Sequence, residues 1–251
     1  MKTTVITICW NSERTLARCV RSVLTQSSRP VEHIVVDGGS TDGTLRVLAE
    51  LAPEYAAAGV ALRVLGQERR AGEAGIPSAW NQGLTAARGE LIALLNSDDW
   101  YEPSALASVQ DAFAGAPPPG PEMVVAPVNL VRGQDGGVEK TLYPKCLWLA
   151  EILMPVPHPG CFVRRGVYFS QVGLFDCRYR IAADYDFVWR CRKARVRMAF
   201  LPEPLVNMEI GGLANRSRRL ARRETLAIAC RHSRFPAPAW IAWGLRTLAG
   251  I

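Results

Sequence analysis

Acidic side chains follow two of the apolar runs in this sequence. Asp37 comes directly after residues 31–36, and Asp98 and Asp99 come shortly after residues 91–95. Carboxylate oxygens accept hydrogen bonds from a nucleobase or a ribose, and they are ligands that hard divalent cations prefer. Two adjacent carboxylates repel each other unless a cation or solvent offsets their charge. The alternative is a solvated turn in which an Asp caps the following helix.

Apolar runs and helical patterns alternate along the first half of the chain. The runs cover residues 5–9, 31–36, 60–65 and 91–95, and the helical patterns cover residues 16–24, 44–51, 78–88 and the segment opened by Pro103. Uninterrupted apolar runs are typical of parallel strands buried on both faces. The sequence therefore predicts an α/β fold, with a mostly parallel, Rossmann-like sheet covered by helices on both faces. Ligands bind such sheets beyond the carboxyl ends of the strands, where the three Asp residues are expected.

The pattern is less regular after a proline-rich break at residues 116–121. Two strands, over residues 123–130 and 138–143, and a helix over residues 181–195 are expected there. We divide the chain into a main domain (1–215), with a first half (1–115) and a second half (122–215), and a tail (216–251).

The net charge of +7 is concentrated in the tail. Eight Arg stand there against Glu224 alone, whereas acidic and basic residues balance in the main domain. This excludes a nucleic-acid groove across the body, so no nucleic-acid partner is expected. An apolar segment with Trp240 and Trp243 follows the arginines, a pattern that suits the headgroup region of an anionic membrane. The alternative is a basic helix followed by a short helix that packs on the body or on a second subunit.

The sequence has no sign of export. It lacks the apolar core of a signal peptide near its start, and no stretch reaches the roughly 18–20 apolar residues that span a bilayer. Its seven cysteines are scattered without a CxxC pair, which is typical of reduced thiols. We expect a cytoplasmic protein, peripheral at the inner face of the plasma membrane.

Several stretches resemble a known family. TVITICWNSERTLARCVRSVLTQ, VEHIVVDGGSTDGT and AWNQGLTAARGELIALLNSDDWY resemble glycosyltransferase family 2 proteins with the GT-A fold, in particular those of bacterial surface polysaccharides such as O-antigen and lipopolysaccharide. MPVPHPGCFVRRGVY and VGLFDCRYRIAADYDFVWR are similar to the same subgroup. The resemblance implies an inverting, metal-dependent transferase that moves a sugar from a nucleotide-diphosphate donor, such as a UDP-sugar, to a hydroxyl of an acceptor, such as a lipid-linked glycan.

The resemblance also implies roles for residues on the donor side. Asp37 would bind the nucleobase, with Thr7 and Trp10 at the edge of the base pocket. Asp98 would lie near the ribose and the metal, and Asp99 would bind Mg²⁺ or Mn²⁺. A bound divalent ion stabilises the negative charge of the leaving diphosphate without a proton donor.

On the acceptor side, the resemblance implies that Asp184 is the catalytic base, with Asp186 as its rival. An inverting displacement needs one base within hydrogen-bond reach of the attacking hydroxyl. Asp184 is expected near the first turn of a helix, where the helix dipole favours its ionised form. His158 is a candidate contact to diphosphate, metal or acceptor, against the alternative of an ordinary loop histidine. Trp100 is a candidate wall of the sugar pocket.

The sequence departs from the family beside the donor, where Pro77 and Ser78 replace the Tyr and Asp that relatives often carry. Three other functions compete with sugar transfer. A nucleotidyltransferase uses a similar sheet, and an NAD-dependent enzyme would need the GxGxxG turn that this chain lacks. A non-catalytic module could bind membranes or nucleic acid through the tail.

Overall fold

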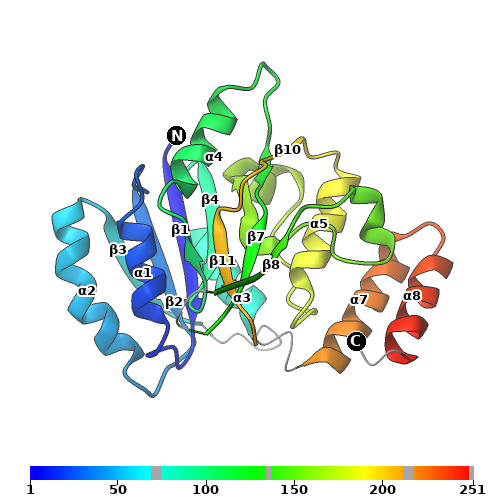
Figure 1. The fold of residues 1–251 in the computed structure, drawn as a ribbon, viewed down its shortest axis with the longest axis horizontal. Coiled ribbons are helices and arrows are strands. Elements are labelled where there is room, and N and C mark those ends of the chain that lie inside the picture. The colour runs from blue at the N-terminus through cyan, green and yellow to red at the C-terminus, as the bar shows by residue number, and fades with distance from the viewer. Residues whose placement is uncertain (69–74, 134–136, 212–216, 249–251) are drawn as a thin grey trace.

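The computed structural model describes the chain except for residues 69–74, 134–136, 212–216 and 249–251. A seven-stranded sheet runs through the molecule in the order β10-β6-β9-β4-β1-β2-β3 (Figure 1). Its strands are β1 (Thr3–Cys9), β2 (Glu32–Asp37), β3 (Ala61–Gly66), β4 (Leu91–Asn96), β6 (Met123–Val125), β9 (Cys161–Arg164) and β10 (Met198–Phe200). β4, β1, β2 and β3 are parallel, whereas β9 is antiparallel to both neighbours, β4 and β6. The predicted mostly parallel sheet is confirmed.

Helices cover both faces of this sheet, as the sequence predicts. They are α1 (Leu16–Leu24), α2 (Thr44–Ala58), α3 (Ile76–Ala86), α4 (Ala105–Ala114) and α5 (Ala183–Lys193). Two further helices, α7 (Arg218–His232) and α8 (Ala237–Leu248), pack beyond α5. α1, α2 and α4 pack on one face, and α3 and α5 pack on the other. Short 3₁₀ helices cover Leu147–Glu151 and His158–Gly160, and a π-helix covers Val167–Gln171.

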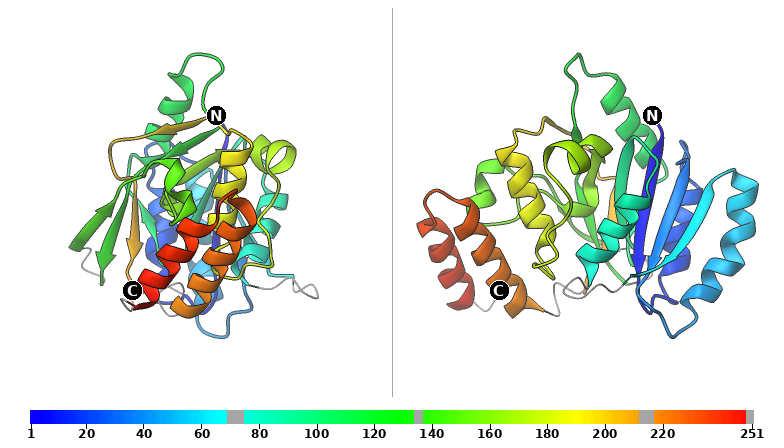
Figure 2. Two further views of the ribbon diagram at one scale, coloured as in Figure 1. Left: turned by 90° about the vertical axis from the view of Figure 1, so that its right-hand side faces the viewer. Right: turned by 180° about the vertical axis from the view of Figure 1, so that it is seen from behind.

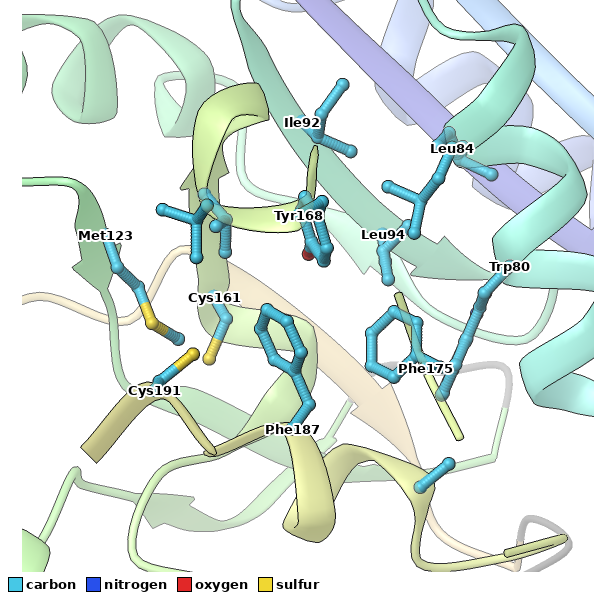
Figure 3. Close-up of a cluster of buried hydrophobic side chains, with 14 of the residues drawn as sticks. Trp80, Leu84, Ile92, Leu94, Met123, Cys161, Tyr168, Phe175, Phe187 and Cys191 are labelled. Carbon is cyan, nitrogen blue, oxygen red and sulfur yellow. The ribbon is translucent and has the colours of Figure 1, made fainter. Parts of the chain in front are cut away.

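The core under α3 and α5 joins the two halves of the chain. Trp80 from α3, Phe175 from a loop and Phe187 from α5 form a chain of ring contacts, with centroids 4.9 and 5.0 Å apart. Figure 3 shows these rings beside the buried Cys161 and Cys191. Because burial of apolar surface stabilises the fold, this cluster fixes α5 against the sheet.

A second, four-stranded sheet joins the two halves at another point. Its order is β5 (Trp100–Tyr101), β11 (Val206–Glu209), β7 (Val128–Arg132) and β8 (Gly137–Leu142). β5 comes shortly after β4 in the chain. Because β5 pairs with β11, the β11 segment near the end of the main domain lies at the carboxyl end of β4. The second half is therefore less regular than the first, yet it closes over the same edge of the large sheet.

α2 is longer than predicted, because it continues through Pro53 to Ala58. Proline removes one backbone donor and is unfavourable inside a helix. Leu48, Leu51 and Tyr55 are nevertheless buried on one side of α2. The burial of this face on both sides of Pro53 explains why the helix does not end there.

The start of the tail packs against the main domain. α7 packs along α5, and its Ile228 is fully buried among Tyr185, Trp189 and Ala182. α8 lies outside α7, at the end of the molecule opposite β3 (Figures 1 and 2). In the parts of the chain that the structure describes, no helix is long and apolar enough to cross a membrane.

Candidate functional site

Loops that follow β1, β2 and β4 are hydrogen-bonded to one another at the carboxyl edge of the large sheet. The backbone N–H of Asn11 donates to Ser40 Oγ at 2.8 Å, and the backbone N–H of Ser12 donates to Thr44 Oγ1 at 2.8 Å. The hydroxyls of Ser12 and Ser97 are 2.8 Å apart. Asn11 has a φ of 50°, which costs free energy and is found where surrounding contacts hold the backbone. The rim of the site is thus tied together across three loops.

Asp37 lies at the end of β2, as predicted, but its carboxylate is used within its own turn. Oδ2 accepts hydrogen bonds from the backbone N–H groups of Gly39 and Ser40, at 3.1 and 3.0 Å. Oδ1 accepts a bond from Ser40 Oγ at 2.6 Å, and the side chain is 5% exposed. A direct bond from Asp37 to a nucleobase would compete with these contacts, so its geometry is that of a residue that shapes the turn.

Trp10 is the large aromatic group at this edge, with 66% of its surface exposed. Gly38 lies beside it so closely that a Cβ atom there would be 3.3 Å from Trp10 Cβ. Thr7 does not reach the edge: it is fully buried in the middle of β1, and its hydroxyl bonds His33 Nε2 at 2.8 Å. The structure therefore brings Trp10 and the Asp37 turn together and leaves Thr7 out.

Asp99 is buried at the end of β4, with 1% of its surface exposed. Its Oδ2 accepts a bond from Asn96 Nδ2 at 3.1 Å, and its Oδ1 accepts a bond from the backbone N–H of Glu209 at 3.3 Å. Burial first, and then the charges of Asp98 and Glu209, raise the pKa of Asp99 well above its ordinary value. The site thus holds a carboxylate whose ionised form needs a positive charge.

Glu209 and Arg18 lie beside Asp98 and Asp99, and the sequence alone did not indicate a role for either residue. Arg18 Nη2 donates to Glu209 Oε2 at 2.7 Å and to the backbone oxygen of Asp98 at 3.4 Å. Its guanidinium lies over the ring of Trp100, 3.5 Å from the centroid. One face of Trp100 is therefore covered by Arg18, which limits it as a wall of a sugar pocket. A residue paired across 191 positions leaves no local signal that could have found it.

The residues around Asp99 fit a divalent cation that takes part of its ligands from a bound molecule. Among the residues that the structure describes, no three His, Cys, Asp or Glu side chains are arranged to hold a metal by themselves. Mg²⁺ typically uses one or two protein carboxylates, with substrate phosphates and water as its other ligands. Asp98 and Asp99 offer such a partial set of hard oxygen ligands, and a cation would offset the charge that burial disfavours.

His158 lies in the 3₁₀ helix His158–Gly160, next to the same edge. The register that pairs Ala93 with Phe162 places this helix beyond the carboxyl end of β4. Its ring is packed on Trp80, with centroids 4.7 Å apart, and burial lowers the pKa of His158 to about 4. His158 is therefore a neutral imidazole at pH 7. Nearby, Ser78 is buried in the first turn of α3.

Asp184 occupies the first turn of α5, as predicted. Burial, and then the charge of Glu224, raise the pKa of Asp184 to about 6, although its Oδ1 accepts a bond from the backbone N–H of Tyr185 at 2.8 Å. Burial first, and then the charges of Cys191 and Asp184, raise the pKa of the Cys161 thiol, so the Asp184 carboxylate lies near Cys161. Cys161 follows His158 by three residues, so Asp184 lies near the strand that begins directly after the 3₁₀ helix of His158. A carboxylate with a pKa near 6 is poised to accept a proton at neutral pH.

Asp186 differs from Asp184 in every contact. It is 1% exposed, and its two oxygens bond Arg190 Nε and His232 Nε2, each at 2.7 Å. Burial alone would raise the pKa of Asp186, but the bond to His232 and the charge of Arg190 outweigh it and lower this pKa. Asp186 is therefore a partner in a buried ion-pair network.

Residues 4–170 match the model of the glycosyl transferase family 2, and the chain belongs to this family. A PGL/p-HBAD biosynthesis glycosyltransferase of Mycobacterium bovis is 30% identical over 212 residues, which cover 82% of this chain and 76% of that protein. An uncharacterised glycosyltransferase of a Nostoc species is 28% identical over 228 residues, 86% of this chain and 66% of that protein.

Solved structures share the fold. Staphylococcus aureus TarS 1–349 in complex with UDP-GlcNAc has a TM-score of 0.68 at 19% identity, and the match covers 94% of this chain and 68% of that one. The mannosyltransferase PcManGT from Pyrobaculum calidifontis, in complex with GDP-Man and Mn²⁺, has a TM-score of 0.68 at 19% identity, over 96% and 68% of the two chains. The fold is GT-A, and the matches favour none of the competing functions considered from the sequence.

Proposed function

We propose that this protein transfers a sugar from a nucleotide-diphosphate donor, preferably a UDP-sugar, to an acceptor hydroxyl with inversion. The observation that carries the proposal is the presence of two carboxylates with raised pKa values in different surroundings, the buried Asp99 after β4 and the partly buried Asp184 in the first turn of α5. Asp99 lies beside Asp98 and Glu209, as a cation ligand does, whereas burial and the charge of Glu224 raise the pKa of Asp184 to about 6. Relatives with this fold bind UDP-GlcNAc or GDP-Man, which supports a nucleotide-sugar donor.

The donor would lie along the carboxyl edge of the sheet. The exposed ring of Trp10 offers a stacking surface for the base, and the turn shaped by Asp37 forms the wall beside it. α1, α2 and α3 each follow a parallel strand, so all three begin at this edge. Helix N-termini attract anions, which suits a diphosphate. Asp98 would approach the ribose, and Asp98 and Asp99 would hold Mg²⁺ or Mn²⁺, which stabilises the charge of the leaving diphosphate.

Asp184 would act on the acceptor. Its carboxylate would accept the proton of the attacking hydroxyl while the oxygen forms a bond to the anomeric carbon of the sugar. The bond from that carbon to the diphosphate breaks, and the nucleoside diphosphate leaves with the electron pair. Attack from the side opposite the leaving group inverts the anomeric carbon. Neutral His158, between Trp80 and the edge of the site, would contact the sugar or the acceptor as a hydrogen-bonding group.

A nucleotide screen tests the donor site. UDP, GDP, dTDP and CDP are added to the protein with and without Mn²⁺, and the unfolding midpoint is measured. A ligand that binds the folded protein raises the midpoint by mass action. We expect UDP to raise it most, and only with Mn²⁺ present. A screen in which no nucleoside diphosphate raises the midpoint would contradict the proposed donor site, and an equal rise without Mn²⁺ would contradict the role of the metal.

We also propose that the protein binds an anionic bilayer, where a lipid-linked acceptor would lie. Trp240, Ile241 and Leu245 of α8 are exposed and fall within a sector of about 140° around the helix. Buried Ala239 lies on the opposite side. Exposed arginines of α7, such as Arg223, supply charge that anionic headgroups would attract. A protein held at the inner face of the plasma membrane in this way would reach a lipid-linked glycan.

Flotation with vesicles tests this part of the proposal. Ile241→Ser combined with Leu245→Ser is expected to reduce flotation with vesicles that contain phosphatidylglycerol. Val64→Ser is the matched control, because Val64 is an exposed apolar residue on β3, far from α8. Turnover of a soluble acceptor should be unchanged in both variants. Equal flotation of all three proteins, or equal binding to neutral phosphatidylcholine, would contradict an anionic membrane as the partner.

A further inference from the structure

Glu224 is the acidic residue of the arginine-rich α7, and it is 8% exposed. Its two carboxylate oxygens accept hydrogen bonds from three consecutive backbone N–H groups. The N–H of Arg180 donates to Oε1 at 2.9 Å, and those of Ile181 and Ala182 donate to Oε2 at 2.8 and 2.9 Å. Asp184 follows this triplet by two residues, so the contacts of Glu224 end directly beside it.

These bonds give partners to backbone groups that the local sequence leaves without one. Ala182 is the N-cap residue of α5, and its side chain cannot accept a hydrogen bond. The N–H of Ala182 and those of the two residues before it have no partner within the helix, and burying such groups without a partner is costly. Because Glu224 binds these groups from outside, the conformation of the segment that leads into α5 depends on α7, in which Glu224 lies 42 residues after Ala182.

Two further residues of α7, Ile228 and His232, hold it against α5. Glu224, Ile228 and His232 are four residues apart and form one stripe that faces the body of the molecule. Ile228 is fully buried, and the ring of His232 stacks on Trp189 with centroids 5.7 Å apart. α7 therefore cannot move away from α5 without breaking the contacts of all three residues.

We propose that Glu224 is a positioning residue of the transfer reaction, which holds residues 180–182 and thereby fixes the carboxylate of Asp184 toward the acceptor. The inference rests on the proposed role of Asp184 as the base. Under this proposal α7, which lies outside residues 4–170 matched by the family model, contributes to the transfer reaction. Glu224 also faces Asp184 with its charge, together with the Cys161 thiol of β9, whereas Asp186 on α5 is bound to Arg190 and His232.

Glu224→Ala and Glu224→Gln test the proposal, with Ile228→Ala as the matched control. Ile228→Ala loosens the same helix but leaves the three hydrogen bonds of Glu224 in place. We expect Glu224→Ala to lower kcat about ten- to a hundredfold with little change in the donor KM, because a misplaced base slows the chemical step. Glu224→Gln keeps one acceptor oxygen and should recover part of this loss. Removal of the charge should also shift the acid limb of the kcat profile to lower pH.

Asp184→Asn, measured alongside, separates the two proposals. If Asp184→Asn is inactive while both Glu224 variants keep the wild-type kcat and pH profile, Glu224 has no positioning role. The same conclusion follows if Ile228→Ala loses as much kcat as Glu224→Ala, because the loss then reflects a loosened helix alone. If Asp184→Asn stays active, the base itself is misassigned, and the inference fails with it.

Discussion

Asp99 is buried and Asp184 is partly buried, and both carboxylates have raised pKa values, but different surroundings raise them. Asp99 lies at the end of a strand of the first half, beside Asp98 and Glu209. Asp184 lies at the start of a helix of the second half, and the charge that acts on it comes from Glu224 on α7. Repulsion among close carboxylates is relieved by a cation, whereas a carboxylate with a pKa of about 6 suits the proton transfer that we propose for Asp184.

The comparison teaches that burial alone does not assign a role to a carboxylate. Asp186 is as buried as Asp99, yet Arg190 and His232 pair it on both oxygens. The partners distinguish the three residues: other acids lie around Asp99, a backbone N–H and the charge of Glu224 act on Asp184, and Arg190 and His232 bind Asp186. Each environment predicts a different result for the same Asp to Asn substitution.

Asp184→Asn should have the largest effect on turnover. Loss of a general base costs about 10²–10⁴-fold in rate, so kcat should fall by that factor. The measurement is steady-state release of nucleoside diphosphate in the presence of acceptor. A variant within tenfold of the wild type would show that another group takes the proton.

Asp99→Asn should lower turnover by about a thousandfold, because a metal ion contributes several kcal/mol to the stabilisation of the developing charge. The same change should leave the protein without ligands at least as stable as the wild type. It removes a buried acid whose ionised form is disfavoured next to Asp98 and Glu209. Turnover and the urea midpoint without metal, measured on one preparation, check both expectations. A variant that is both fully active and less stable would contradict the assignment of Asp99 as a cation ligand.

Asp186→Asn should act on stability rather than on chemistry. Breaking a buried ion pair from one side costs about 3–5 kcal/mol. Arg190 loses its carboxylate partner, although it still donates to backbone oxygens of residues 172–174. Urea unfolding should report this loss, while kcat per folded molecule at low temperature stays near the wild-type value. If this variant is inactive and fully folded while Asp184→Asn turns over normally, the roles of the two residues are reversed.

The smallest effect is expected in the pH dependence of kcat/KM and of the unfolding free energy, which should follow the ionisation of Asp184. A base with a pKa of about 6 is active when deprotonated, so kcat/KM should fall as the pH drops below about 6. Because folding raises this pKa from 3.8, ionised Asp184 destabilises the folded state above pH 4, and the cost is complete above pH 6. Asp184→Asn should therefore exceed the wild type in unfolding free energy at pH 8, by up to about 3 kcal/mol, and lose this advantage near pH 4. Equal unfolding free energies at pH 8 would contradict the raised pKa.

Much of the first half could be predicted from the sequence, because its signals are local. Uninterrupted apolar runs indicate buried parallel strands, and the residues directly after them must lie at one edge of the sheet. Asp37 ends β2, and Asp98 and Asp99 follow the end of β4, as these signals predict. The turn at Asp37 also has a local signal, since an Asp followed by Gly-Gly-Ser favours a turn closed by its own side chain. Thr7 stands two residues before the end of β1, too early to reach the edge.

The second half could not be predicted to the same depth, because its key contacts are distant in the sequence. Glu209 reaches Asp99 across 110 residues through the pairing of β11 with β5. Glu224 was counted as one acid in a basic tail, and nothing near it indicates that it binds residues 180–182. The charge pattern predicts an appended tail, whereas α7 packs on the second half of the main domain through the buried Ile228 and Glu224. A charge count does not report which face of a helix is buried.

The most direct test of the division of roles is equilibrium binding of UDP, with and without Mn²⁺, to the wild type, Asp99→Asn and Asp184→Asn. Calorimetric titration measures the affinity in each case. The account predicts that Asp184→Asn binds UDP and Mn²⁺ as tightly as the wild type, whereas Asp99→Asn loses the increase in affinity that Mn²⁺ brings. Loss of that increase in Asp184→Asn, or its full retention in Asp99→Asn, would contradict the account.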